Sequence, residues 1–321
     1  AAQTAKGDPT DVAFEIMNAT TREPGTVSRL TIDLVTVRPN RVIDLANPGS
    51  QFTARAVPLI DSAEYIITAY ADGVPYWWSK RGRDLKAGPI LLHVFDTAPG
   101  PEGLAIAAMD VILRHEGATL QLQYMVQVRN DLAPQVTVGG SGPSFALALP
   151  AGLQDLEAVY MRGPDPTPIE VAAGGGMSGL TFPVTPGMTQ VRIEARLPWT
   201  EGMEIAVGSN LAVESWSLLV APEDMKVRAF GVRDKTDQPI KGYTSLSADP
   251  IDAGDTVDLT LSDPGPATAT VEDLFAATEA AQAEAEEGEE ESGGGPNYLP
   301  LIFLGGLLIV ILIGAARRRK E

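Results

Sequence analysis

The sequence contains no cysteine, and only two of its 321 residues are histidine. Without cysteine, the chain cannot form disulfides, thiolate zinc sites, iron–sulfur clusters or a CxxCH haem attachment, and residue 1 cannot carry a bacterial lipoprotein anchor. Two histidines are too few for a histidine-rich metal site, and they leave few candidates for Ser-His-Asp catalysis. Functions that depend on cysteine or on a histidine-rich metal site are therefore excluded within this chain.

Motifs of common enzyme classes are also missing: the sequence has no GxSxG, HExxH or DxDxDG pattern. His93 alternates with apolar neighbours as a strand residue does, and His115 lies in the turn sequence "LRHEGA". The glycine-rich run 173–180, "AGGGMSGL", has no lysine at P-loop spacing. We therefore expect no catalytic residue, no metal site and no cofactor.

Positive charge is scarce, since 24 Lys and Arg stand against 42 Asp and Glu, for a formal net charge of −18. Such a surface repels the phosphates of nucleic acid and anionic lipid headgroups, and it suits the soluble body of an exported protein. We expect no nucleic-acid partner.

A long apolar run is present at the C-terminus, where residues 298–316 include no charged side chain. These 19 residues would form about 28 Å of helix at ~1.5 Å per residue, which matches one hydrocarbon core. The sequence therefore predicts one transmembrane helix. The residues that we assign to this anchor are Tyr298, Leu301, Phe303, Gly305, Gly306 and Ile313.

Four consecutive cations follow the apolar run, and they predict its orientation because clusters of Lys and Arg stay cytoplasmic. The chain starts "AAQTAKGDPT", without Met, as a mature chain does after signal-peptide removal. We expect a single-pass protein of the bacterial inner (cytoplasmic) membrane with a periplasmic body and a cytoplasmic C-terminus. The topology signal consists of Arg317, Arg318, Arg319 and Lys320.

A second interpretation of the tail remains open. The stretch "ESGGGPNYLPLIFLGGLLIVILIGAARRRKE" resembles the tripartite C-terminal sorting signals of bacterial surface proteins. The resemblance implies that the helix would be removed from the mature protein. We favour a retained anchor.

The body shows the period-two alternation of β-strands between glycine- and proline-rich turns. In residues 11–100, the stretches "GTVSRLTIDLV", "GSQFTARAVP" and "AEYIITAYADGVPY" follow one another. This order is similar to that of the carboxypeptidase-regulatory-like, transthyretin-like β-sandwich, over about residues 10–97. The resemblance implies a seven-stranded sandwich without catalysis, of a kind commonly added to exported bacterial proteins.

The fold class that we expect is all-β, with tandem Ig-like or transthyretin-like sandwiches, then a linker and one transmembrane helix. The second sandwich is predicted at 101–222, where Leu120, Leu122, Tyr124, Val126 and Val128 alternate strictly. The remaining predicted parts are a loose N-terminus at 1–10, a small β unit at 223–270, an acidic Ala/Glu-rich and then Gly-rich linker at 271–297, the helix at 298–316 and a basic tail at 317–321.

The stretch "DGVPYWWSKRGRD", residues 72–84, combines two of the four tryptophans with three cations. In a strand, Tyr76 and Trp78 share one face and Trp77 takes the other, so at least one indole is expected in the core. One interpretation is a core strand followed by a solvated loop, and another is a carbohydrate-stacking platform. The functional hypothesis is a protein-contact patch, because Trp, Tyr and Arg are common interface anchors. Its residues are Tyr76, Trp77, Trp78, Lys80, Arg81 and Arg83.

These features together predict a non-catalytic accessory or scaffold subunit. We expect its sandwiches to bind and stabilise other subunits of a membrane complex, for example a respiratory or photosynthetic electron-transfer complex, while its helix contacts the lipid bilayer. A cell-surface module for polysaccharide or another extracellular ligand is the alternative, and an exported hydrolase is the third hypothesis.

Overall fold

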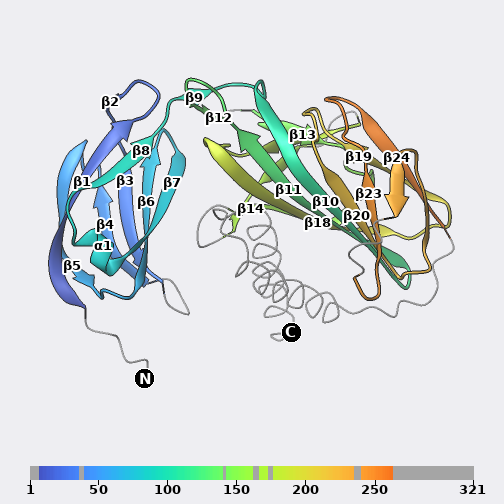
Figure 1. Ribbon diagram of the computed structural model, residues 1–321, viewed down its shortest axis with the longest axis horizontal. Coiled ribbons are helices and arrows are strands. Elements are labelled where there is room, and N and C mark those ends of the chain that lie inside the picture. The colour runs from blue at the N-terminus through green and yellow to red at the C-terminus, as the bar shows by residue number, and fades with distance from the viewer. Residues whose placement is uncertain are drawn as a thin grey trace, which may run out of the picture.

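A computed structural model shows two β-sandwich lobes joined at one end (Figure 1). The regular structure of the described residues is β, apart from the four-residue helix α1 (Gly82–Leu85). The all-β prediction is therefore confirmed. The structure describes residues 7–35, 40–139, 142–161, 166–172, 176–234 and 240–262.

The first lobe consists of two four-stranded sheets. In one, β1 pairs with β2 and β5 in antiparallel fashion and with β8 in parallel. The other has the antiparallel order β4-β3-β6-β7. Their bounds are β1 (Asp8–Asn18), β2 (Glu23–Pro24), β3 (Arg29–Leu34), β4 (Asn40–Ala46), β5 (Gln51–Leu59), β6 (Glu64–Ala71), β7 (Val74–Arg81) and β8 (Ile90–Val94).

The core of the first lobe lies between these two sheets, and alternation in the sequence predicts its members. Val12, Phe14 and Ile16 of β1 are buried, and so are alternate residues of β8. On β3, burial is not limited to one face, since Thr31 and Asp33 are also buried. The outward face of the sheet that holds β3 is therefore partly covered.

The second lobe is a larger sandwich in which one eight-stranded sheet has the order β15-β14-β18-β11-β10-β20-β23-β22. Two three-stranded sheets, β13-β17-β16 and β19-β24-β21, complete it. The bounds are β10 (Leu104–Glu116), β11 (Thr119–Asn130), β13 (Phe145–Leu147), β14 (Gln154–Met161), β15 (Thr167–Pro168), β16 (Glu170–Ala172), β17 (Ser178–Thr181), β18 (Gly187–Pro198), β19 (Met203–Gly208), β20 (Trp216–Ala221), β21 (Lys226–Arg228), β22 (Val232–Asp234), β23 (Thr244–Ala248) and β24 (Thr256–Ser262).

The strands after residue 222 belong to this second sandwich, as far as the described residues extend. β23 pairs with β20 inside the eight-stranded sheet, and β24 pairs with β19 over six residues. Leu246, Leu259 and Leu261 share one buried cluster with Leu120 and Leu122. The predicted small unit at 223–270 is therefore corrected: through Ser262 its strands complete the second core.

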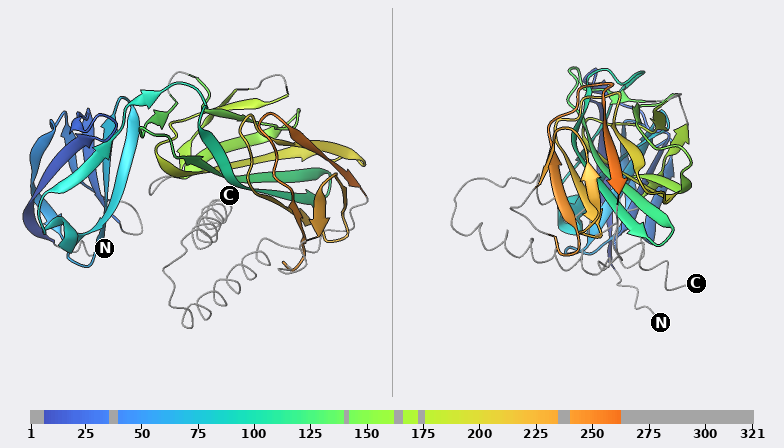
Figure 2. Two further views of the ribbon diagram at one scale, coloured as in Figure 1. Left: turned by 45° about the horizontal axis from the view of Figure 1, so that its top comes forward. Right: turned by 90° about the vertical axis from the view of Figure 1, so that its right-hand side faces the viewer.

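A short parallel pair joins the two lobes, as the views in Figures 1 and 2 show. It consists of β9 (Thr97–Ala98) and β12 (Thr137–Val138). Beside it, Thr20 Oγ1 of the first lobe donates a hydrogen bond to the Gln135 carbonyl at 2.5 Å and accepts one from the Asp96 amide at 3.0 Å. The junction thus has direct polar contacts between segments far apart in the sequence.

No helix among the described residues is long and apolar enough to cross a bilayer. Residues 8–10 of the predicted loose N-terminus belong to β1, where they pair with residues 57–59 of β5, so the prediction is corrected there; residues 1–6 lie outside the described residues. The linker at 271–297, the helix at 298–316 and the basic tail at 317–321 lie outside them as well. All the residues that we assign to the anchor and to the topology signal are in these segments.

Candidate functional site

The candidate contact patch lies mainly on β7, the last strand in the order β4-β3-β6-β7. A two-residue turn at Asp72 and Gly73 reverses the chain between β6 and β7, with φ angles of 51° and 79°. Asp-Gly suits this turn because both positions need a positive φ. The turn fixes which side chains of β7 face the core.

Tyr76 is not on the surface, because only 3% of it is exposed. Its hydroxyl donates to the Phe95 carbonyl at 3.1 Å and lies 2.8 Å from Thr137 Oγ1, while its ring packs against Phe95. Tyr76 therefore connects β7 with the segment that joins the two lobes. This corrects the prediction that Tyr76 belongs to a contact surface.

The two adjacent tryptophans lie on opposite faces of the sheet, as alternation predicts. Trp78 is half-buried and packs against the first core. Trp77 is half-buried on the outward face, opposite Thr68 of β6. Its indole Nε1 is buried and makes no hydrogen bond with any described residue. The two rings therefore do not form one flat stacking platform.

The three cations of the patch are exposed. Lys80 and Arg81 end β7, and Arg83 lies in α1 directly beyond them. Arg83 Nε is 3.8 Å from Asp84 Oδ1, and both side chains are more than half exposed, so this pair contributes little to stability. The chain therefore presents three cations within four residues at one end of the first sandwich.

Sequence reasoning missed a second polar group on the same outward face. Arg29 donates two hydrogen bonds to Asp44, at 2.9 and 2.6 Å, and its guanidinium lies 5.9 Å from the centre of the Tyr70 ring. Arg41 Nε donates to Asp33 Oδ1 at 2.6 Å. Alternation could have indicated this face, because buried Leu30 and Ile32 direct their neighbours on β3 outward.

The hydrogen bond from Arg29 holds the pKa of Asp44 below its usual value, and nearby positive charge acts in the same direction. An unfolded Asp has a pKa near ~3.9, so the stabilisation from this pair is present above about pH 4. It is lost as the pH falls through the lower folded pKa. We expect the difference in unfolding free energy between wild type and Asp44→Asn to shrink as the pH falls below about 4. Urea unfolding at stepped pH measures this difference.

The matched variant Arg29→Gln removes the other partner and should show the same pH dependence. A difference that stays constant from about pH 7 to below about pH 4 would contradict the role of this pair.

The two histidines lie in different lobes, His93 on β8 and His115 near the end of β10 rather than in the turn that the sequence predicts. His93 is exposed on β8, in register with Met17. The His115 ring lies 4.7 Å from the Trp199 ring, and its buried Nε2 makes no hydrogen bond there. No group of three or more His, Asp or Glu side chains gathers as a metal site within the described part of the chain.

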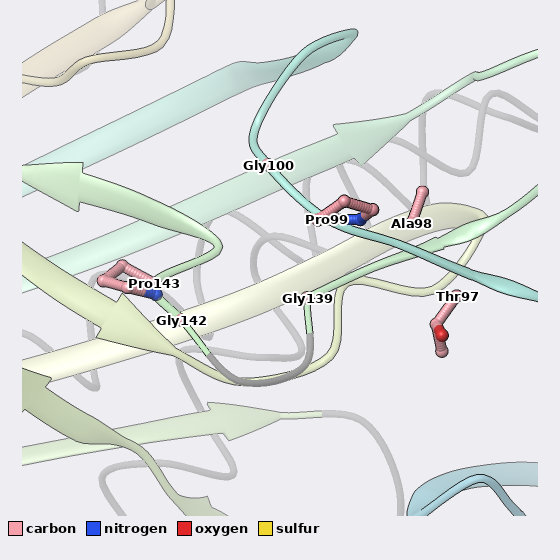
Figure 3. A pocket seen from close by; sticks show the side chains of 7 residues that line it. All are labelled: Thr97, Ala98, Pro99, Gly100, Gly139, Gly142 and Pro143. Atoms are coloured by element: carbon pink, nitrogen blue, oxygen red, sulfur yellow. The ribbon is translucent and has the colours of Figure 1, made fainter.

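A hollow of about 370 Å³ lies at the junction of the lobes (Figure 3). It is lined by residues 97–100 together with Gly139, Gly142 and Pro143. These seven residues include no charged side chain, and Thr97 supplies the one side-chain hydroxyl. Such a lining offers backbone groups and small apolar surfaces, but no acid, base or nucleophile pair.

No protein-family model matches the chain, and no curated protein is similar to it in sequence. Solved structures that match include the M1 zinc metallopeptidase from Deinococcus radiodurans, with 14% identity and a TM-score of 0.29, over 50% of this chain and 42% of that one. Two structures of leukotriene A4 hydrolase from Saccharomyces cerevisiae match at 9% and 8% identity, with TM-scores of 0.30 and 0.33.

Each of the two hydrolase matches covers 50% of this chain and 29% of the other. This chain therefore spans less than half the length of these three proteins. Similarities this low carry no argument about fold or activity.

Proposed function

We propose that the chain is a non-catalytic accessory or scaffold subunit that binds and stabilises a larger membrane protein complex through its β-sandwiches. The observation that carries this proposal is the end of β7, where Lys80, Arg81 and Arg83 are exposed in a chain of net charge −18. Half-buried Trp77 lies on the same strand, β7, and its side chain is on the outward face of that strand, as is the side chain of Arg81. Arg and Trp are common interface anchors, and a local cationic surface orients an acidic body toward an acidic partner.

The membrane part of the proposal rests on the sequence. The uncharged run at 298–316 and the cations at 317–320 support a retained single-pass anchor in the bacterial inner membrane, with both sandwiches outside the cytoplasm. A partner complex in the same membrane would then meet the cationic surface at high local concentration. Respiratory and photosynthetic electron-transfer complexes are examples of such partners.

We further propose that the first lobe is of the carboxypeptidase-regulatory-like, transthyretin-like type. In support, its two sheets contain seven strands of five or more residues, in addition to the two-residue β2. The resemblance implies a sandwich without catalysis, which agrees with a scaffold role.

Charge reversal at the end of β7 tests the contact. We expect Lys80→Glu combined with Arg81→Glu to lower the yield of co-purified partner by about tenfold or more after mild detergent extraction, since about 1.4 kcal/mol changes an affinity tenfold. Mass spectrometry of the gradient fractions identifies and quantifies the partner. Both side chains are exposed, so the variant should fold normally.

Arg55→Glu is the matched control, because Arg55 is an exposed cation on β5, in the other sheet of the same lobe. It should leave co-purification unchanged. An equal loss in both variants would mean that net charge matters rather than this surface.

If the wild-type chain migrates in the gradient without any other protein, the scaffold role is contradicted. Glycan binding that is lost in Trp77→Ala would instead favour the surface-module hypothesis.

A further inference from the structure

A second surface stands out at the bend between β21 and β22, where Phe230 is 97% exposed. Among the large apolar side chains of the described residues, Leu91 is the next most exposed, at 45%. Val227 and Val232, on either side of the bend, pack against the second core. Gly231 has a φ of 77°, which permits the sharp reversal. The bend is thus held at both ends, and its tip presents an isolated aromatic ring to solvent.

Exposed cations flank this ring on the edge of the sandwich. Lys226 and Arg228 of β21 and Phe230 of the bend are exposed, whereas Val227 and Ala229 between them are half-buried, so the three exposed side chains point away from the core. Arg233 follows the bend, and its Nη2 is 3.2 Å from Asp249 in an exposed ion pair. β21 and β22 are each the last strand of their sheets. We call Lys226, Arg228, Phe230 and Arg233 the Phe230 edge.

The Phe230 edge also lies beside the C-terminal end of the described residues. Ser262, the last described residue, is directly opposite Lys226 in the β21–β24 pair. The apolar run begins at Tyr298, so 35 residues separate it from Ser262. If the linker that the sequence predicts behaves as a random coil, 35 residues would have an end-to-end distance of about 30–35 Å, at roughly 5–6 Å times the square root of the length. A membrane anchor would therefore hold this edge close to the bilayer surface.

We propose that the Phe230 edge docks on the lipid bilayer, with the Phe230 ring inserted at the headgroup level and the cations on anionic phosphates. This inference rests on the proposed membrane anchor. A single protruding ring suits lipid better than protein, because lipid accommodates it without a preformed pocket. The cations beside Phe230 add local attraction to anionic headgroups, against the repulsion expected of the chain as a whole at net charge −18. Tethering makes even a weak contact populated, since the bilayer is at high effective concentration.

The absence of cysteine makes the test direct. Phe230→Cys creates a single thiol on the full-length chain, which is labelled with the apolar fluorophore NBD and reconstituted into nanodiscs of phosphatidylcholine and phosphatidylglycerol. A nitroxide-bearing lipid then reports contact with the bilayer. We expect at least about threefold stronger quenching at position 230 than at a solvent-facing position, because an interfacial label lies at the acyl–headgroup boundary.

Leu156→Cys is the matched control. Leu156 is also an exposed apolar residue, and its strand β14 is separated from β22 by five strands of the same sheet. Arg228→Glu with Arg233→Glu, added to Phe230→Cys, should weaken quenching in discs that contain phosphatidylglycerol. Thermal unfolding of each labelled variant confirms that the chain is folded.

The outcomes separate this inference from the proposed function. If the chain elutes with the discs but both labels are equally unquenched, the docking edge is overturned and the anchor stands. If the chain does not elute with the discs, the anchor fails and the docking inference fails with it. If the label at 230 is shielded only as protein concentration rises, or only when a partner complex is added, the edge contacts protein and lipid docking is overturned.

Discussion

Leu259→Ala is expected to destabilise the entire second sandwich by about 2–5 kcal/mol, the usual range for removing a buried leucine side chain. Leu259 lies on β24 and is completely buried in the core of that lobe. β24 pairs with β19 on one side and with β21 on the other. A cavity at this position therefore weakens a core that residues from Leu104 to Leu261 share. Differential scanning calorimetry of the full chain should show one unfolding transition for this lobe, and the variant should shift that entire transition to lower temperature.

Two variants serve as references for that experiment. Leu122→Ala, on β11 of the same core, should move the same transition. Phe14→Ala should move a different one, because Phe14 belongs to the separate core of the first lobe. If Leu259→Ala removed only a small transition and left the one sensitive to Leu122→Ala unchanged, β24 would belong to an independent unit, as the sequence predicts for residues 223–270.

Local chemistry made much of the fold predictable. Strict alternation on β11 predicts the inward row from Leu120 to Val128, and each member of that row is buried. Two-residue turns at Asp72-Gly73 and after Glu116 predict the β6–β7 and β10–β11 hairpins. These features depend on neighbours in sequence, where side-chain period and turn residues determine the outcome.

Long-range pairing was beyond this reasoning. β10 pairs in parallel with β20, so that Met109 lies opposite Trp216, and no local pattern specifies that partner. The error at residue 222 has the same origin, because β20 pairs with β23 across the predicted boundary. Tyr76 likewise meets Thr137 from 61 residues away. Alternation predicts that Tyr76 and Trp78 share a face of β7, but not that Tyr76 contacts the segment that joins the lobes.

The candidate site divides in the same way. The order of cations after β7 is a local property, and the sequence indicated it. Phe230 was missed because "VRAFGVRD" reads as one apolar strand pattern interrupted by cations. The structure instead divides it between two sheets, so that Phe230 lies at the bend. An exposed aromatic residue becomes visible only when the course of the chain is known.

Gly82→Ala is expected to destabilise the first sandwich by about 1–3 kcal/mol or more, the range for forcing extra atoms into a packed site. Gly82 joins β7 to α1 and is buried. A Cβ at this position would lie 2.1 Å from the Ile60 carbonyl oxygen and 3.2 Å from Cε2 of Tyr65. Neither neighbour is free to move, because the Tyr65 hydroxyl accepts a hydrogen bond from the Ile60 amide at 2.9 Å and donates one to the Pro58 carbonyl at 2.8 Å.

Gly142→Ala is the control, since no atom of the described residues, its chain neighbours aside, lies within 4 Å of an added Cβ. It should be neutral, or stabilising by about 0.4–1 kcal/mol through the lower entropy of the unfolded chain. Thermal unfolding measures both variants. An unchanged first-lobe transition in Gly82→Ala would mean that the chain does not pass this close to Ile60.

Gly82 separates Arg81 from Arg83, so the displacement expected in Gly82→Ala should lower both partner binding and the stability of the first lobe. Charge reversal at Lys80 and Arg81 should weaken binding alone. That difference separates a residue that positions the cationic surface from the cations that make the contact.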